Sequence, residues 1–180
     1  SILVNNFGRK YFKILKNNNL NILTLTQHHK DFLVNLGVKR EKIFVQPNPV
    51  VNIKNKKNER KKQIIYAGRI SEEKGILELL NAWKAKDSNS IKLYGYRENK
   101  EVLELIRESK AVVTATKLFE GQPTLLCEAS ALSIPSIFPD TGGIKDFFPE
   151  GYILKFEQYD YKKLSDKLEY VINSEDLDSI

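Results

Sequence analysis

From about residue 63 onward, the apolar residues of the chain follow two alternating patterns, short continuous runs and a helical spacing. Short apolar runs ended by Gly, Pro or polar residues are typical of buried strands, and apolar residues spaced three and four apart are typical of helices with one buried face. The runs predict strands at residues 63–67, 91–94, 111–116, 135–138 and 152–156. The helical spacing predicts helices at residues 73–86, 100–110, 123–132 and 161–173.

Strands and helices therefore alternate through this part of the chain. A helix between two strands is typical of a right-handed crossover, which makes the strands parallel. Since a parallel sheet is covered on both faces, the fold class expected is α/β, a Rossmann-like parallel sheet with helices on both faces.

The first 50 residues follow the same alternation. They predict a strand at 22–26, a helix at 29–36 that Gly37 ends, and a strand at 43–46. Because they precede a long polar run, we expect residues 1–50 to be the end of an N-terminal domain, 51–62 a basic linker, and 63–180 a C-terminal domain.

The charge of the chain is concentrated in that polar run. The net charge is +6, and residues 54–62 (KNKKNERKK) contain no apolar side chain. A run of this kind is typical of a solvated linker, although it could also contact a membrane surface, an acidic acceptor or nucleic acid. The linker is the interpretation we prefer.

Composition excludes several classes of protein. With 180 residues, 41% hydrophobic and 29% charged, the chain is neither disordered nor collagen-like. It has no run of 18 apolar residues and no visible signal peptide, so we expect a cytoplasmic protein. Cys127 is the single cysteine, which allows no internal disulfide and favours a small core residue. The chain begins with Ser1 and contains no methionine, so we expect it to be processed or part of something longer.

The segment FEGQPTLLCE, residues 119–128, carries the most informative chemistry. Glu128 lies in an apolar run, where a carboxylate either faces water or holds a hydrogen-bonding ligand. Pro123 suits the first position of a helix, which would leave the backbone amides of residues 121–125 as an anion site suited to phosphate. With Glu120 before that site and Glu128 beyond it, the layout suits a nucleotide sugar.

Two further loops follow predicted strands, at the edge where ligands of doubly wound sheets bind. Arg69 and Lys74 follow the first strand of the second domain and could bind a diphosphate, or could be surface residues with Lys74 paired to Glu78. Tyr96 and Arg97 could stack on a base or could form a plain polar turn.

Other kinds of site find no support in the sequence. His28 and His29 are neighbours and cannot both face one metal ion from a helix. The phosphate-binding motifs GxxxxGK[ST] and GxGxxG are absent. The glycines at 142 and 143 more often mean only a turn.

Three segments together resemble the retaining GT-B glycosyltransferases of the group 1 (family four) class. They are YAGRISEEKGILELL (66–80), FEGQPTLLCEASALSIPSI (119–137) and PDTGGIKDFF (139–148). Residues 24–48 also look like the last strand, helix and strand of that class before its interdomain linker. The resemblance implies that residues 63–180 are the C-terminal, donor-binding half of a GT-B fold.

The resemblance implies a role for each candidate residue. Arg69 and Lys74 would bind the donor diphosphate and stabilise its charge as it leaves, and Glu120 would meet the sugar hydroxyls. Glu128 would hold the ribose, and the loop containing Tyr96 and Arg97 would lie near the base. The remaining donor-binding residues would be Gly68, Gly121, Gln122, Pro123, Thr124 and Leu125.

The implied reaction is transfer of a sugar, with retention, from a UDP- or GDP-linked donor to a glycan or lipid-linked acceptor in polysaccharide biosynthesis. It implies no metal site and no other cofactor. The implied partners are the nucleotide sugar, the acceptor and a peripheral contact with the inner face of the cell membrane, without nucleic acid. Two other interpretations remain open, a GT-B epimerase of sugar nucleotides and a noncatalytic basic module that binds membrane or nucleic acid.

The sequence departs from the family pattern in three places. Most of the acceptor-binding domain is absent, so we expect the chain to bind donor and to transfer poorly. The connection from 86 to 91 is short where the family has a further strand and helix, which are either lost or missing from the sequence. Ala115 and Thr116 stand where the family has Pro-Ser, which affects the wall of the donor pocket.

Overall fold

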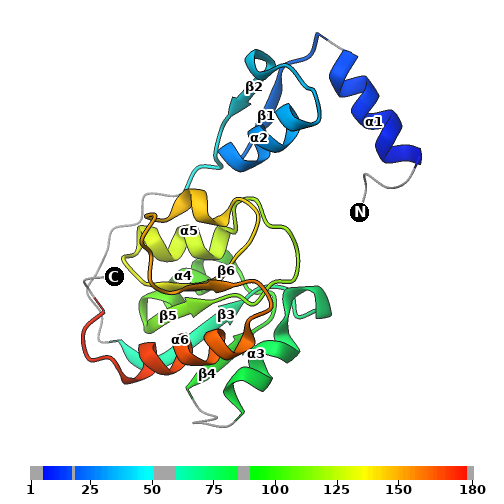
Figure 1. The fold of residues 1–180 in the computed structure, drawn as a ribbon. Helices are drawn as coiled ribbons and strands as arrows, with labels where there is room; N and C mark the ends of the chain where they lie inside the picture. The colour runs from blue at the N-terminus through cyan, green and yellow to red at the C-terminus, as the bar shows by residue number, and fades with distance from the viewer. Residues whose placement is uncertain (1–5, 18, 51–59, 85–89, 178–180) are drawn as a thin grey trace. The chain divides into compact units, whose positions relative to one another are not determined.

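The computed structural model describes residues 6–17, 19–50, 60–84 and 90–177. The chain divides into two compact units, Ser1–Asn48 and Pro49–Ile180 (Figure 1). Within the described residues of either unit, no helix is long and apolar enough to cross a membrane.

In its described residues, the smaller unit contains two parallel strands and two α-helices. Its elements are α1 (Asn6–Asn17), β1 (Ile22–Thr24), α2 (Gln27–Asn35) and β2 (Ile43–Val45). The side chain of Thr26 caps α2 by accepting a hydrogen bond from the amide of His29, 3.1 Å away. The strands and α2 were predicted within a few residues of their bounds. α1 was not predicted, although Phe7, Tyr11, Ile14 and Leu15 have helical spacing.

The larger unit is a five-stranded sheet in which all neighbouring strands are parallel, in the order β4-β3-β5-β6-β7. Its strands are β3 (Lys61–Ala67), β4 (Ile91–Tyr94), β5 (Ser109–Val113), β6 (Ser136–Asp140) and β7 (Lys155–Glu157). Its α-helices are α3 (Ile76–Trp83), α4 (Asn99–Arg107), α5 (Thr124–Ala131) and α6 (Tyr161–Asn173).

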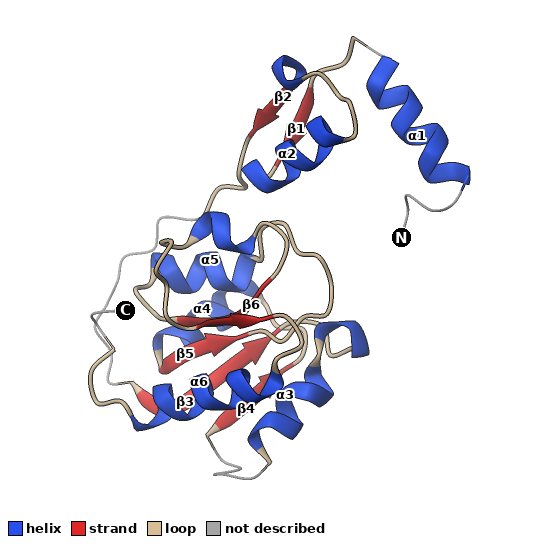
Figure 2. Ribbon diagram, in the orientation of Figure 1, coloured by secondary structure: helices blue, strands red, loops and turns tan. Residues whose placement is uncertain are grey.

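Helices lie on both sides of this sheet (Figure 2). α3 packs against α6 on one side, and α4 packs against α5 on the other. The expected α/β class, a Rossmann-like parallel sheet covered on both faces, is therefore confirmed.

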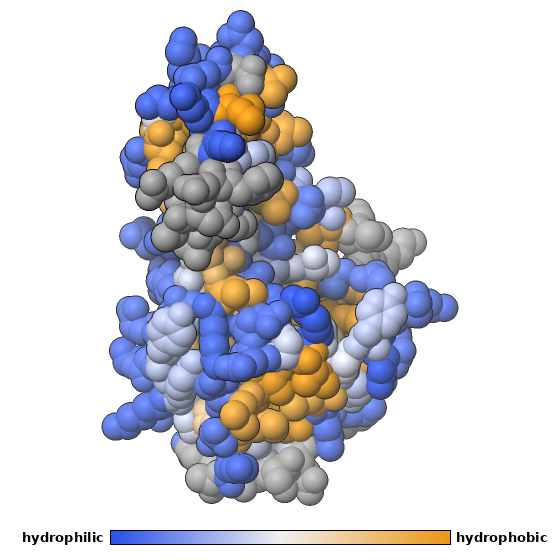
Figure 3. Space-filling view, turned by 90° about the vertical axis from the view of Figure 1, so that its right-hand side faces the viewer, coloured by the Kyte–Doolittle hydropathy of each residue, from blue (hydrophilic) through white to orange (hydrophobic). Residues whose placement is uncertain are grey.

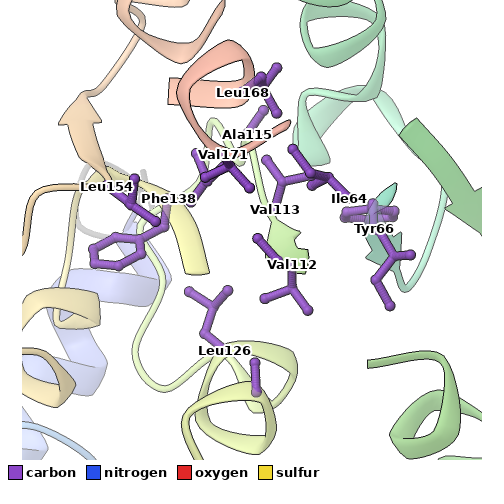
Figure 4. Packing of buried hydrophobic residues seen from close by; sticks show 14 of the residues in the cluster. Ile64, Tyr66, Val112, Val113, Ala115, Leu126, Phe138, Leu154, Leu168 and Val171 are labelled. Carbon is purple, nitrogen blue, oxygen red and sulfur yellow. The ribbon is translucent and has the colours of Figure 1, made fainter. Parts of the chain in front are cut away.

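The core of the larger unit lies between the sheet and these helices. Figure 4 shows Ile64, Val112 and Phe138 from the strands packed with Leu126 of α5 and Leu168 of α6. All five side chains are completely buried. Burial of a large aliphatic side chain stabilises a fold by about 1.5–3 kcal/mol, so this cluster dominates the stability of the unit.

The predicted helix 73–86 was wrong at its start. Residues Glu72–Lys74 form a 3₁₀ helix, Gly75 adopts a left-handed backbone with φ of 67°, and only then does α3 begin. A Cβ atom on Gly75 would lie 1.9 Å from the carbonyl oxygen of Ala115, so only glycine fits this close approach. The close approach brings the loop after β3 against the end of β5.

Other boundaries also differ from the predictions. The predicted strands 111–116, 135–138 and 152–156 are β5 at Ser109–Val113, β6 at Ser136–Asp140 and β7 at Lys155–Glu157. Lys61 and Lys62, assigned to the linker, begin β3, because the amide of Lys61 donates to the carbonyl of Glu108 and pairs this end of the strand with β5. The same pairing ends the predicted helix 100–110 at Arg107. Residues 51–59 of the predicted linker and 85–89 of the short connection lie outside the described residues.

Candidate functional site

The loops that follow β3, β4 and β5 meet at the carboxyl edge of the sheet, where two adjoining cavities open. The larger has a volume of about 720 Å³ and the smaller about 290 Å³. Both are lined by Ala67, Gly68, Arg69, Thr124 and Leu125. The two cavities therefore meet at the end of β3 and the first turn of α5.

In the smaller cavity, Lys74 forms an ion pair with Glu120. Both side chains are mostly buried, with 23% and 20% of their surface exposed. The alternative pairing of Lys74 with Glu78 was wrong, because Glu78 pairs with Lys117 at 2.5 Å. Two candidates from different loops, 46 residues apart in the sequence, are thus brought into contact.

Arg69 lies where the two cavities meet. Its guanidinium is largely exposed and pairs with Glu73, 3.1 Å away and four residues further along the chain. The hydroxyl of Tyr66 donates to the backbone carbonyl of Arg69 at 2.7 Å and fixes the loop. Burial, aided by the charge of Glu120, raises the pKa of Tyr66, so its hydroxyl keeps its proton and remains a donor.

In the larger cavity, Glu128 is buried and 9% exposed. Its Oε1 atom accepts a hydrogen bond from the Asn99 side-chain amide at 2.6 Å. The side chain does not simply face water, and α4 supplies a partner that was not predicted; the role of Glu128 in holding a ligand stays a prediction. An isolated buried carboxylate would be costly, and the amide of Asn99 offsets part of that cost.

Tyr96 and Arg97 line the larger cavity from the loop after β4. Tyr96 is 82% exposed, so its ring is free to meet a planar ligand. Arg97 is held locally, with its Nε atom 3.1 Å from Glu101 and its guanidinium 6.0 Å from the centre of the Tyr94 ring.

The first turn of α5 carries backbone donors. Pro123 is the residue before the helix rather than its first residue, because its ψ of 113° is extended. The amides of Leu126 and Cys127 donate to its carbonyl, which leaves those of Thr124 and Leu125 ahead of the first hydrogen bonds of the helix. This arrangement attracts anions.

The remaining candidates lie nearby with different exposure. Gln122 and Pro123 line the smaller cavity, while Gly121 lines neither. Cys127 is buried, as predicted, and burial raises the pKa of its thiol, which keeps it protonated.

Asn99 and Thr116 are site residues that the sequence did not reveal as such. Asn99 lies within the candidate GYREN loop but had no signal to separate it from a turn residue. Thr116 had been noted only as a departure from the family pattern, yet its hydroxyl donates to Glu120 Oε1 at 3.0 Å. Among the described residues, no group of three or more His, Cys, Asp or Glu could hold a metal ion.

Taken together, the edge offers two cations, free backbone amides and two carboxylates in one continuous hollow. Cations and amides bind phosphate, and carboxylates accept hydrogen bonds from hydroxyls. The arrangement is suited to a ligand that carries both phosphate and hydroxyl groups.

Solved structures share this fold. HepE from Anabaena in complex with UDP and glucose superposes with a TM-score of 0.76 at 14% identity, covering 92% of this chain and 57% of HepE. The lipopolysaccharide outer core galactosyltransferase WaaB has a TM-score of 0.74 at 18% identity, covering 96% of this chain and 57% of WaaB. A mutant of S. aureus TarM in complex with fondaparinux, alpha-GlcNAc-glycerol and UDP has a TM-score of 0.73 at 17% identity, covering 93% of this chain and 40% of TarM.

The chain thus spans between 40 and 57% of the length of these three proteins, and identities this low show the fold alone. No curated protein sequence matches the chain. The sequence model of the family "Glycosyl transferases group 1" matches residues 81–179, more than half of the chain. The chain belongs to the group 1 glycosyl transferase family.

Proposed function

We propose that this chain supplies the donor site of a retaining glycosyltransferase of the family four class, which transfers a hexose from a nucleotide diphosphate sugar to a glycan or lipid-linked acceptor. The observation that carries the proposal is the continuity of the two cavities through Arg69 and the first turn of α5. One ligand could therefore reach Glu120 and Glu128 at once, with its diphosphate between them.

Each end of the hollow suits a different part of such a donor. In the smaller cavity Glu120 would accept hydrogen bonds from the sugar. In the larger cavity Glu128 would accept from the ribose, and the exposed ring of Tyr96 would stack on the base. HepE and TarM were each solved with UDP, which favours a uridine over a guanosine donor.

The chemistry proposed depends on stabilising the leaving group. Negative charge develops on the diphosphate as the bond to the sugar breaks, and Arg69, Lys74 and the amides of Thr124 and Leu125 would stabilise it. Departure of the diphosphate from the face on which the acceptor attacks would give retention. Glu120 would orient the sugar and would not act as half of a glycosidase acid and base pair.

Acceptor and location are part of the same proposal. WaaB is named for its action on the lipopolysaccharide outer core, which supports a glycan acceptor here. The net charge of +6 supports a contact with the anionic inner face of a cell membrane, made through the basic run at 54–62. On this proposal, the acceptor would be bound by residues other than those that line the two cavities.

Calorimetry with UDP, GDP and their sugars tests the donor site. We expect the chain to bind one nucleotide series, with affinity at least tenfold weaker in both Arg69→Ala and Glu128→Ala, a loss of about 1.4 kcal/mol or more. Glu150→Ala, at an exposed turn, is the control and should bind like the unmodified chain. Circular dichroism checks folding, and Glu128→Gln keeps the side-chain volume if the alanine variant unfolds.

Two outcomes would overturn the proposal. One is the absence of binding to every nucleotide in the series by the folded chain. The other is binding that is unchanged in Arg69→Ala and in both Glu128 variants, because the nucleotide would then lie elsewhere.

A further inference from the structure

Glu120 is held in place by more contacts than its ion pair with Lys74. The hydroxyl of Thr116 donates to Glu120 Oε1 at 3.0 Å and accepts from the amide of Leu118 at 3.2 Å. Thr116 itself is 2% exposed, so its hydroxyl cannot turn away to water without losing both bonds. The side chain of Thr116 therefore ties the carboxylate of Glu120 to the start of its own loop.

The backbone of Glu120 is fixed by a second loop. The amide of Gly143, in the turn after β6, donates to the Glu120 carbonyl at 2.9 Å. The neighbouring Gly142 has φ of 60°, and a Cβ atom there would lie 2.1 Å from the same carbonyl oxygen. The sequence suggested only a turn for these glycines, but the turn needs glycine because it packs directly on Glu120.

The contacts leave one side of the carboxylate for a ligand. Within the described residues, Thr116 and Lys74 both donate to the Oε1 atom of the Glu120 carboxylate. Oε2 is then the oxygen with which Glu120 can accept a hydrogen bond from a hydroxyl in the smaller cavity, which Glu120 lines. A carboxylate already held in one orientation loses little conformational freedom when a ligand binds.

We propose that Thr116 is a positioning residue that orients Glu120 toward the sugar of the donor, while the turn at Gly142 and Gly143 fixes the Glu120 backbone. The inference rests on the proposed function, since it assumes that Glu120 meets a sugar. On this proposal, binding of the sugar, as distinct from the nucleotide, depends on the hydroxyl of Thr116, a buried residue that lines neither cavity.

The test separates the sugar from the nucleotide. Calorimetry on the full chain compares UDP with UDP-glucose, UDP-galactose and UDP-GlcNAc, and GDP with GDP-mannose. Thr116→Val keeps the shape of the side chain and removes the hydroxyl, and Thr116→Ser keeps the hydroxyl. Ser130→Ala is the control, because it removes a hydroxyl that bonds to the Leu126 carbonyl within α5.

We expect Thr116→Val to weaken binding of the preferred sugar nucleotide five- to twentyfold and to leave binding of the bare nucleotide unchanged. Thr116→Ser and Ser130→Ala should stay within twofold of the unmodified chain for both ligands. Recovery by serine would show that the hydroxyl, rather than the packing of the methyl group, is what matters.

Other results would overturn the inference, and they differ from those that overturn the proposed function. An equal loss for sugar nucleotide and bare nucleotide in Thr116→Val, or no loss at all, would remove the role of Thr116 while the donor site stands. Binding of bare nucleotides without any sugar nucleotide would overturn this inference and the sugar-donor part of the proposed function, because Glu120 would then meet no sugar, while the nucleotide site would stand. A folded chain that binds no nucleotide removes the proposed function and this inference together.

Discussion

At the residue scale, the two glutamates of the site are held by different kinds of donor. Glu120 is paired with the cation Lys74, whereas Glu128 accepts from the neutral amide of Asn99. A neutral donor satisfies one lone pair of Glu128 and leaves its charge in place, so further hydroxyl donors remain favourable at this position. This difference fits a neutral, hydroxyl-rich group beside Glu128 and a charged one near Lys74.

Asn99→Ala should weaken nucleotide binding without unfolding the chain. Without the amide of Asn99, the side chain of Glu128 is no longer held in one orientation. A hydrogen bond of this kind contributes about 1 kcal/mol, which corresponds to roughly fivefold in affinity. Calorimetry with UDP measures the loss, and Asn81→Ala, at an exposed position of α3, is the control. Unchanged affinity in Asn99→Ala would show that Glu128 needs no support from α4.

At the scale of single elements, α3 has one buried face and one exposed face. Ile76, Leu79 and Trp83 are buried against the sheet and α6, while Leu77 and Leu80 are exposed. In the larger unit, Figure 3 shows a hydrophobic patch surrounded by hydrophilic residues on the side of the molecule that carries α3. Helical spacing alone does not predict which of these leucines is buried. The tertiary contacts therefore decide which of them contributes to stability.

Leu79→Ala and Leu77→Ala form a matched pair on that helix. Leu79 is completely buried and Leu77 is 61% exposed. We expect the free energy of unfolding to fall by about 2–5 kcal/mol for Leu79→Ala and by less than about 0.5 kcal/mol for Leu77→Ala. Urea unfolding followed by circular dichroism measures both, and equal effects would contradict the packing of α3.

The ion pair between Glu78 and Lys117 joins α3 to the loop that leads to Glu120. The hydrogen bond from Lys117 lowers the pKa of Glu78 below 4.5, and the bond to Glu78 raises the pKa of Lys117 above 10.5. Since a lowered carboxyl pKa contributes stability above its unfolded value, the pair should stabilise the fold fully near neutral pH. That contribution is lost as the pH falls through the folded pKa of Glu78.

Lys117→Gln should therefore reduce the melting temperature at pH 7 and have a smaller effect at acidic pH. Thermal unfolding from pH 7 down to pH 3.5 measures the difference from the unmodified chain at each step. Lys84→Gln, which also removes one exposed positive charge from the larger unit, controls for the change in net charge. A difference that stays constant over this range would exclude the pair as its cause.

At the scale of the whole molecule, the larger unit holds everything that the proposed donor site needs. The core cluster and the linings of both cavities consist of residues between 64 and 177. The larger unit therefore has its own core and its own candidate site.

A fragment that begins at Pro49 should fold and bind nucleotide like the full chain. We expect the same cooperative unfolding transition as for the larger unit within the full chain, and affinity for UDP within about twofold, because no cavity residue is removed. Circular dichroism and calorimetry on both proteins make the comparison. An unfolded fragment, or one that has lost binding, would show that residues 1–48 support the site.

Much of the fold could be predicted from the sequence because its strands and helices have strong periodic patterns. The bounds of β4 and α6 agree with the prediction, and the buried positions of α6 follow the predicted spacing of Leu164 and Leu168. The break at Gly75 could not be predicted, because it depends on the carbonyl of Ala115, just after β5 and 40 residues away in the sequence. Strand ends were similarly decided by pairing with neighbouring strands.

The sequence by itself determined the α/β class and the candidate chemistry, because periodicity and the polar residues at strand ends are local properties of the chain. Only the tertiary structure decided the partners of the candidates. In the folded chain, Lys74 pairs with Glu120 rather than with Glu78, and Glu128 accepts a hydrogen bond from Asn99. The turn at 142–143 packs on Glu120. Contacts between residues far apart in the sequence depend on how strands are ordered in the sheet, and no local pattern encodes that order.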